Sequence, residues 1–267
     1  MVASPRVNLL KPSTLACLAS LAAAALAPRA AQAQEWTRQS FVLPKGGFEL
    51  TGSPARPDFM RINLSKDSAF KPVEFPINFF WGVTDRVMLG ITHEHGLRLN
   101  SGAPDPKFRD TYNDVGFGSV IFLGGGRNYE VDLNLGVPLP RLSPDIWVGV
   151  RAGVLGRANF AEKVAFYYDP SLYFGFNHRD DGNGDGVNVP VWFYFQPTPM
   201  IAPFVGTGVK GPFKNFGDHF EVPLEGGVLF TVARGIHLGG MLRFPNALGH
   251  GNTLDWRELT FLAQFRF

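Results

Sequence analysis

Cysteine is almost absent from this chain of 267 residues, since the only one is Cys17. It lies in an N-terminal segment in which basic residues precede an apolar run over 15–26 and the small-x-small tripeptide at 31–33. These are the parts of an export signal, so we predict a signal peptide over 1–33 that is cleaved before Gln34. The exported chain then holds no cysteine, which excludes stabilisation by disulfide bonds.

Long apolar runs and an excess of charge are also missing. Beyond the export signal no stretch approaches the roughly 18 consecutive apolar residues of a membrane-spanning helix. That absence still allows a membrane β-barrel, because barrel strands alternate apolar and polar residues. The net charge is only +2. Nucleic-acid binding needs a basic surface, so we expect no nucleic acid as a partner.

A period of two dominates the exported chain, and helical periodicity is not found. Residues 128–137, NYEVDLNLGV, place Tyr129 and alternate apolar residues on one face and Glu130, Asp132 and Asn134 on the other. Similar alternation occurs in 59–64, 73–83, 87–95, 114–123, 146–155, 164–177, 189–196, 201–209, 220–232, 236–244 and 259–267. These segments amount to about twelve strands, most of them long enough to cross a bilayer when tilted.

The connections between these strands form two alternating sets. The short set comprises 84–86, GGGR at 124–127, GRANF at 156–160, 197–199 and 233–235, and the longer, more polar set comprises 96–111, 179–186, 210–218 and 245–255. One end with short turns and one end with long loops is typical of an up-and-down membrane barrel.

The polar face carries charges interspersed with glycine, which suits a crowded lumen. Aromatic residues such as Trp81 and Phe244 gather near strand ends, as an interfacial girdle requires. We therefore expect the apolar face to point to lipid. The side chains predicted to line the lumen are Glu74, Asn78, Glu94, Asp114, Glu130, Asp132, Asn134, Arg151, Asp169, Glu221, Glu225, Arg243, Glu258 and Arg266.

The end of the chain, LTFLAQFRF at 259–267, alternates apolar and polar residues and finishes on Phe267. It resembles the C-terminal strand of Gram-negative outer-membrane β-barrels. The resemblance implies an outer-membrane location, periplasmic termini and short turns, and contact with lipid and lipopolysaccharide. It also implies that the barrel assembly machinery recognises Phe265 and Phe267.

Together these features predict an all-β fold. We expect a single antiparallel transmembrane barrel of about 12 strands over 58–267, with 10 or 14 strands as alternatives. Residues 34–57 are expected as an N-terminal periplasmic segment, and GFELTG at 47–52 as an extra piece outside the strand count.

The predicted lumen holds about nine carboxylates and about four arginines, and no long loop is expected to fold into it. This favours a small passive channel for cations or small polar solutes. The alternatives are a barrel closed by pairing of these charges, with a structural or surface-interaction role, and an outer-membrane hydrolase. The serines near the long-loop end lie in no catalytic motif, so we expect neither an enzyme nor a cofactor.

One loop, HRDDGNGDGVN at 178–188, opens like a calcium-binding loop. Asp181, Asn183 and Asp185 have the D-x-N-x-D spacing, but Trp192 occupies the position of the bidentate glutamate. The sequence allows at most a weak calcium site at 180–186 and favours a hairpin loop of turn-forming residues. The histidines of THEHG at 92–96 are expected to face outward at the rim, with Glu94 facing inward.

Overall fold

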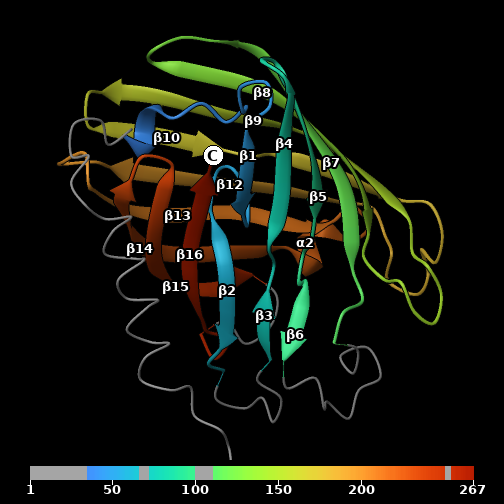
Figure 1. Cartoon of the computed structure of the whole chain (residues 1–267). Helices are drawn as coiled ribbons and strands as arrows, with labels where there is room; N and C mark the ends of the chain where they lie inside the picture. The colour runs from blue at the N-terminus through green and yellow to red at the C-terminus, as the bar shows by residue number, and fades with distance from the viewer. Residues whose placement is uncertain (1–34, 66–71, 100–110, 250–253) are drawn as a thin grey trace, which may run out of the picture.

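The computed structural model describes residues 35–65, 72–99, 111–249 and 254–267. The predicted signal peptide lies outside these ranges. The described residues form one antiparallel sheet of sixteen strand segments that closes on itself (Figure 1). No helix in these ranges is both long and apolar enough to span a membrane.

The strand segments are β1 (Phe48–Thr51), β2 (Asp58–Asn63), β3 (Val73–Phe75), β4 (Asn78–Thr84), β5 (Val87–Thr92), β6 (Leu97–Leu99), β7 (Val115–Gly125), β8 (Tyr129–Leu139), β9 (Gly149–Ala161), β10 (Val164–Tyr168), β11 (Ser171–Gly175), β12 (Gly186–Phe195), β13 (Ile201–Pro212), β14 (Glu221–Ala233), β15 (Ile236–Gly249) and β16 (Glu258–Arg266). Two short helices accompany them, η2 (Trp36–Arg38) and α2 (Phe216–His219).

Four barrel strands are each built from two consecutive segments: β1 with β2, β3 with β4, β5 with β6, and β10 with β11. Proline marks three of the breaks, at Pro54 and Pro57, at Pro76 and at Pro170. Proline has no backbone N–H and cannot donate to the ladder, so it is expected at such interruptions. The sixteen segments therefore make twelve barrel strands, as predicted.

The barrel closes where the last strand meets the first. β16 pairs with β15 on one side and with both β1 and β2 on the other, through Leu50 opposite Phe265 and Ile62 opposite Leu259. The expectation that GFELTG lies outside the wall is wrong, since β1 also pairs with β4. β1 has only four residues, and a proline-rich break separates it from β2. The alternation of apolar and polar residues therefore could not show that both belong to one barrel strand.

A second correction concerns one turn. GRANF was expected to connect two strands, but β9 continues to Ala161 and the turn is Glu162–Lys163. The alternation fades in this segment because Arg157 and Asn159 have inward partners, which are described below. The other short turns lie as predicted.

The apolar face points outward. In β8, Tyr129 is 54% exposed, whereas its neighbour Glu130 is 3% exposed. The same contrast holds for outward residues on other strands, including Trp81, Phe117, Phe193 and Val205, and for inward residues such as Asn134 and Thr260. The predicted orientation of the two faces is therefore confirmed.

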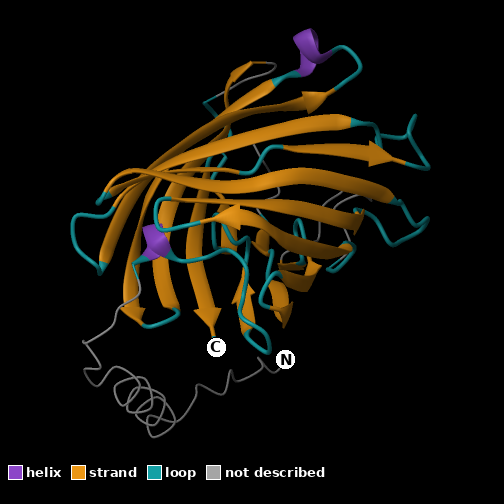
Figure 2. Cartoon of the chain, turned by 90° about the horizontal axis from the view of Figure 1, so that it is seen from above, coloured by secondary structure: helices purple, strands orange, loops and turns teal. Residues whose placement is uncertain are grey.

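We call the edge with the turns at 84–87, 125–129, 161–164, 195–201 and 233–236 the short-turn end, and the opposite edge the long-loop end. The buried apolar cluster lies inside the barrel and includes wall residues Phe80, Met88, Leu155, Tyr167 and Tyr194. The inner face thus carries a group of apolar side chains, beside polar ones, toward the short-turn end. Viewed from above, loop segments enter the space that the strands enclose (Figure 2).

The outward face predicts a position-dependent cost for charge. Val205 lies in the middle of β13 and is 59% exposed, so Val205→Arg should destabilise the barrel by about 2–4 kcal/mol in a bilayer. Denaturant unfolding in phospholipid vesicles, followed by gel mobility, measures this change. Ile146→Arg, in the exposed loop between β8 and β9, should change stability by less than about 1 kcal/mol. Equal losses at both positions would contradict the assigned membrane face.

Candidate functional site: the barrel interior

The N-terminal segment enters the barrel. Residues 35–43, here called the inner segment, form η2 and then an extended stretch. Trp36 in η2 and Phe41 and Leu43 after it are each at most 2% exposed. The Trp36 ring stacks on Tyr167 of β10, with centroids 6.4 Å apart, and Phe41 meets the same tyrosine edge-on at 5.3 Å. The inner segment thus carries its own apolar face, which packs on the apolar part of the wall.

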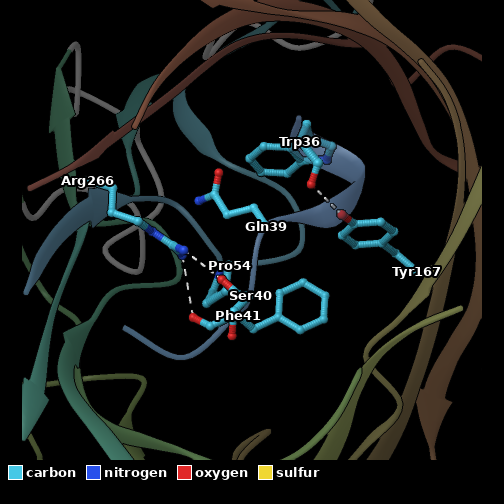
Figure 3. A pocket seen from close by; sticks show the side chains of 7 residues that line it. All are labelled: Trp36, Gln39, Ser40, Phe41, Pro54, Tyr167 and Arg266. Carbon is cyan, nitrogen blue, oxygen red and sulfur yellow. Dashed lines mark hydrogen bonds between the residues drawn. The ribbon is translucent and has the colours of Figure 1, made fainter. Parts of the chain in front are cut away.

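The inner segment crosses the whole lumen. Arg157 of β9 donates to the Gln39 carbonyl oxygen over 2.9 Å. The Gln39 side-chain amide lies 2.8 Å from Nε2 of His237 in β15 and 2.9 Å from the side-chain oxygen of Gln264 in β16. β9 is the sixth and β16 the twelfth barrel strand in order around the wall. Gln39 therefore bridges opposite sides of the barrel, as Figure 3 shows for the residues around it.

Side chains of the wall satisfy the backbone of the inner segment. The Tyr167 hydroxyl donates to the Trp36 carbonyl over 2.8 Å, and Arg266 donates to the Ser40 carbonyl over 2.6 Å (Figure 3). Glu130 accepts from the Ser40 hydroxyl at 2.6 Å and from the Phe41 amide at 2.8 Å. Buried backbone groups are costly when unbonded, so these contacts stabilise the segment inside the lumen.

The inner segment narrows the lumen near the short-turn end. Trp36, Gln39, Ser40, Phe41, Pro54, Tyr167 and Arg266 leave no water-sized space between them. The sequence pattern addresses only long loops as inward elements and predicts residues 34–57 as a periplasmic segment. The described part of that segment instead begins inside the barrel. The sequence did indicate apolar packing inside the barrel, because VAFYY at 164–168 and VWFYF at 191–195 have apolar residues on both faces.

A second inward element lies between β1 and β2. The Tyr194 hydroxyl donates to the Ala55 carbonyl over 3.0 Å. Arg56 pairs with Asp58 at 2.6 Å and with Glu225 at 2.7 Å. The break in the first barrel strand thus places an arginine among inward carboxylates.

Inward carboxylates are mostly paired with arginines. The pairs are Glu49–Arg266, Asp58–Arg61 at 3.2 Å, Glu74–Arg98 at 3.2 Å, Glu130–Arg157 at 3.4 Å, Glu225–Arg243 at 3.3 Å and Glu258–Arg243 at 3.5 Å. Sequence reasoning missed Glu49, Arg56, Asp58, Arg61, Arg98 and Arg157 in the lumen. Arg157 stood in a supposed turn, Arg98 in a supposed loop, and Glu49 and Arg56 in a supposed periplasmic segment.

The residues predicted to line the lumen fall into three groups. Asn78, Asp114, Glu130, Asp132, Asn134 and Glu225 are buried, Glu74, Arg151, Asp169, Glu221, Arg243, Glu258 and Arg266 are partly buried, and Glu94 is exposed. Asp132 is completely buried, and neither of its oxygens has a hydrogen-bond partner within the described residues. Asp169 accepts from the Asn134 amide over 3.1 Å.

The long-loop end keeps a cavity of about 130 Å³. It is lined by His95, Arg98, Asn113, Asp114, Pro140, Arg141 and Trp147. Asp114 accepts from the amides of Glu94, His95 and Gly96, which bends the chain between β5 and β6. The expectation that both histidines of THEHG face outward is wrong for His95, which lies 3.0 Å from the Glu74 carboxylate.

The loop at 178–188 uses its polar atoms internally. Asn183 accepts from the Tyr173 hydroxyl and donates to the Asn177 carbonyl over 2.8 Å. Asp185 pairs with Arg179, and Asp181 lies 3.1 Å from His178. No group of three or more metal-ligating acidic, histidine or cysteine side chains occurs within the described ranges. These contacts account for the residues of the loop as turn-forming groups.

No protein-family model matches the sequence, and no curated protein is detectably similar to it. Solved structures do match the fold. The KdgM porin superposes with a TM-score of 0.53 at 7% identity, covering 83% of this chain and 99% of that one, as does the KdgM porin in complex with disordered oligogalacturonate. The NanC porin gives 0.50 at 8% identity, covering 77% and 96%. At such identities the likeness shows the barrel fold alone.

The buried charge network predicts a large effect from one substitution. Glu225 is 4% exposed and joins Arg56, Arg243 and Trp192, so Glu225→Gln leaves two guanidinium groups short of their shared partner. We expect a loss of about 3 kcal/mol in unfolding free energy, measured by denaturant titration in detergent.

The matched control is Glu221→Gln on the same strand. Glu221 pairs with Lys210 at 2.7 Å, but these side chains are 29% and 36% exposed, so the expected loss is below about 1 kcal/mol. A loss at Glu225 no larger than at Glu221 would show that the central network does not stabilise the barrel.

Proposed function

We propose that the chain is a small outer-membrane channel for small polar solutes, and that its resting state is closed. The observation that carries the proposal is a closed barrel with an apolar outer face and a polar, charged interior toward the long-loop end. Among β-sheets, only a closed wall crosses lipid with its backbone fully hydrogen-bonded, and a polar interior can offer a path for polar solutes.

The orientation follows from the same proposal. Long loops face the outside and short turns the periplasm, as is usual for outer-membrane barrels. The barrel wall contacts lipid, and the outer loops contact lipopolysaccharide. Phe265 lies in the ladder opposite Leu50, and Phe267 is 76% exposed at the end of the closing strand. We assign these two side chains to recognition by the barrel assembly machinery.

A preference for cations is part of the proposal. Most inward carboxylates have an arginine partner, which makes the lumen less acidic than a count of predicted residues suggests. Glu94, in contrast, is exposed near the long-loop end. An exposed carboxylate at the mouth of a confined lumen attracts cations and repels anions.

A closed structural barrel is the second candidate. The packing of the inner segment inside the barrel favours it, because no water-sized space remains between the segment and the wall residues Tyr167 and Arg266. The KdgM porin, similar in fold, was solved with disordered oligogalacturonate, so acidic oligosaccharides are the competing solute class for the channel.

Planar bilayers distinguish these candidates. We expect the purified protein to give discrete conductance steps, and the reversal potential in a potassium chloride gradient to favour potassium. Glu94→Gln should lower the ratio of cation to anion permeability about twofold or more, because it removes this negative charge at the mouth of the lumen. Asp145→Asn, in an exposed loop, is the matched control and should leave the ratio unchanged.

A reversal potential that favours chloride would show that the expected cation preference is wrong, but the channel proposal itself would stand. Block of the current by added galacturonate oligomers would replace small polar solutes by acidic oligosaccharides. A complete lack of steps, both here and with the variants described next, would favour the structural barrel.

A further inference from the structure

We propose that the inner segment, residues 35–43, is an autoinhibitory plug that must leave the short-turn end before the barrel conducts. The proposal rests on the proposed channel function and adds the device that controls it. The inner segment thereby has a regulatory role, because its position decides whether the path for solutes is open.

The inner segment packs against the barrel wall but is not part of the sheet. Its carbonyl and amide groups bond to wall side chains: Tyr167 to Trp36, Asn159 and Gln196 to Thr37, Arg157 to Gln39, Arg266 to Ser40, and Glu130 to Phe41. None of its residues belongs to a strand of the sheet. It can therefore withdraw with every strand-to-strand hydrogen bond of the barrel intact.

The connection to the wall allows such a movement. Residues 44–47 join the inner segment to β1 at the short-turn end, where the Lys45 amide donates to Asp85 over 2.9 Å. Gly46 has a φ of 82°, which favours glycine, and it has open space where a side chain would stand. Gly82 of β4 lets the chain pass, since a Cβ there would lie 2.1 Å from the Pro44 carbonyl oxygen. Backbone hydrogen bonds from Gly46 to Gly82 over 2.7 Å and from Gly82 to Gly47 over 2.9 Å hold this link on the wall, so it would remain as a tether when the inner segment leaves the lumen.

The closed state is favoured at rest. Withdrawal would bring Trp36, Phe41 and Leu43 into water, and apolar exposure of this kind is unfavourable. It would also remove the protein partner of Glu130 at Ser40, although water entering the lumen can replace that hydrogen bond. Openings should therefore be rare in the natural protein and should become frequent when the apolar anchors are shortened.

The first test shortens the anchors. Trp36→Ala combined with Phe41→Ala should raise the open probability in planar bilayers at least tenfold over the natural protein. Phe193→Ala removes an aromatic ring of similar size from the outer face, where Phe193 is 47% exposed, and should leave the open probability unchanged. Gel mobility of the folded form in detergent verifies that each variant retains the barrel.

The second test locks the segment in place. In a Cys17→Ser background the chain contains no other cysteine, so Thr37→Cys with Gln196→Cys provides a unique pair. The Thr37 hydroxyl oxygen lies 2.9 Å from the Gln196 side-chain oxygen, which a short bifunctional methanethiosulfonate can replace. Cross-linking should abolish the conductance steps, and reducing agent should restore them. Gln196→Cys alone, treated with the same reagent, should continue to conduct.

The outcomes separate the two proposals. If the cross-linked protein conducts like the reduced one, the plug proposal is wrong and the channel proposal stands. A Trp36→Ala/Phe41→Ala variant that opens no more often than the natural protein, while the natural protein conducts, also overturns the plug. If neither the natural protein nor this variant conducts, the channel fails and the plug has no path to close.

Discussion

The structure depends on one constraint: a chain that crosses lipid has no water to bond its backbone, so every strand edge must find a partner. The barrel meets this constraint by joining its last strand to two separate pieces of its first, β1 and β2. The outward row of apolar residues then follows from period two, and the polar groups turn inward. Prolines are tolerated where strands are interrupted, because there the missing donor breaks no continuous ladder.

The interior has two parts with different chemistry. Near the short-turn end, aromatic and aliphatic wall residues pack on the inner segment as in the core of a soluble protein, with Trp36 packed against both Tyr167 and Tyr194. Further along the lumen, carboxylates and arginines form a network centred on Glu225 and reached by Arg56 from the break in the first strand. A packed aromatic region and a charged network therefore coexist in one barrel.

Alternation predicted the strands, the outward face and the number of strands, because burial against lipid imposes period two on almost every residue. It could not predict β1, since four residues carry too little pattern and their partners Phe80 and Arg266 are remote in sequence. It also missed the inner segment. Residues 35–43 contain no alternation, and their position depends on side chains from β8, β9, β10, β15 and β16 that only the closed barrel brings together.

The divided first strand has a consequence for the order of assembly. The inner segment precedes β1, the inward residues 52–57 follow it, and β16 must pair with the wall segments on both sides of that loop. Once the seam is closed, the stretch between β1 and β2 is held at each end by the last strand. Residues 52–57 must therefore already lie inside when the last strand pairs with the first. Formation of this seam thus encloses these residues within the barrel.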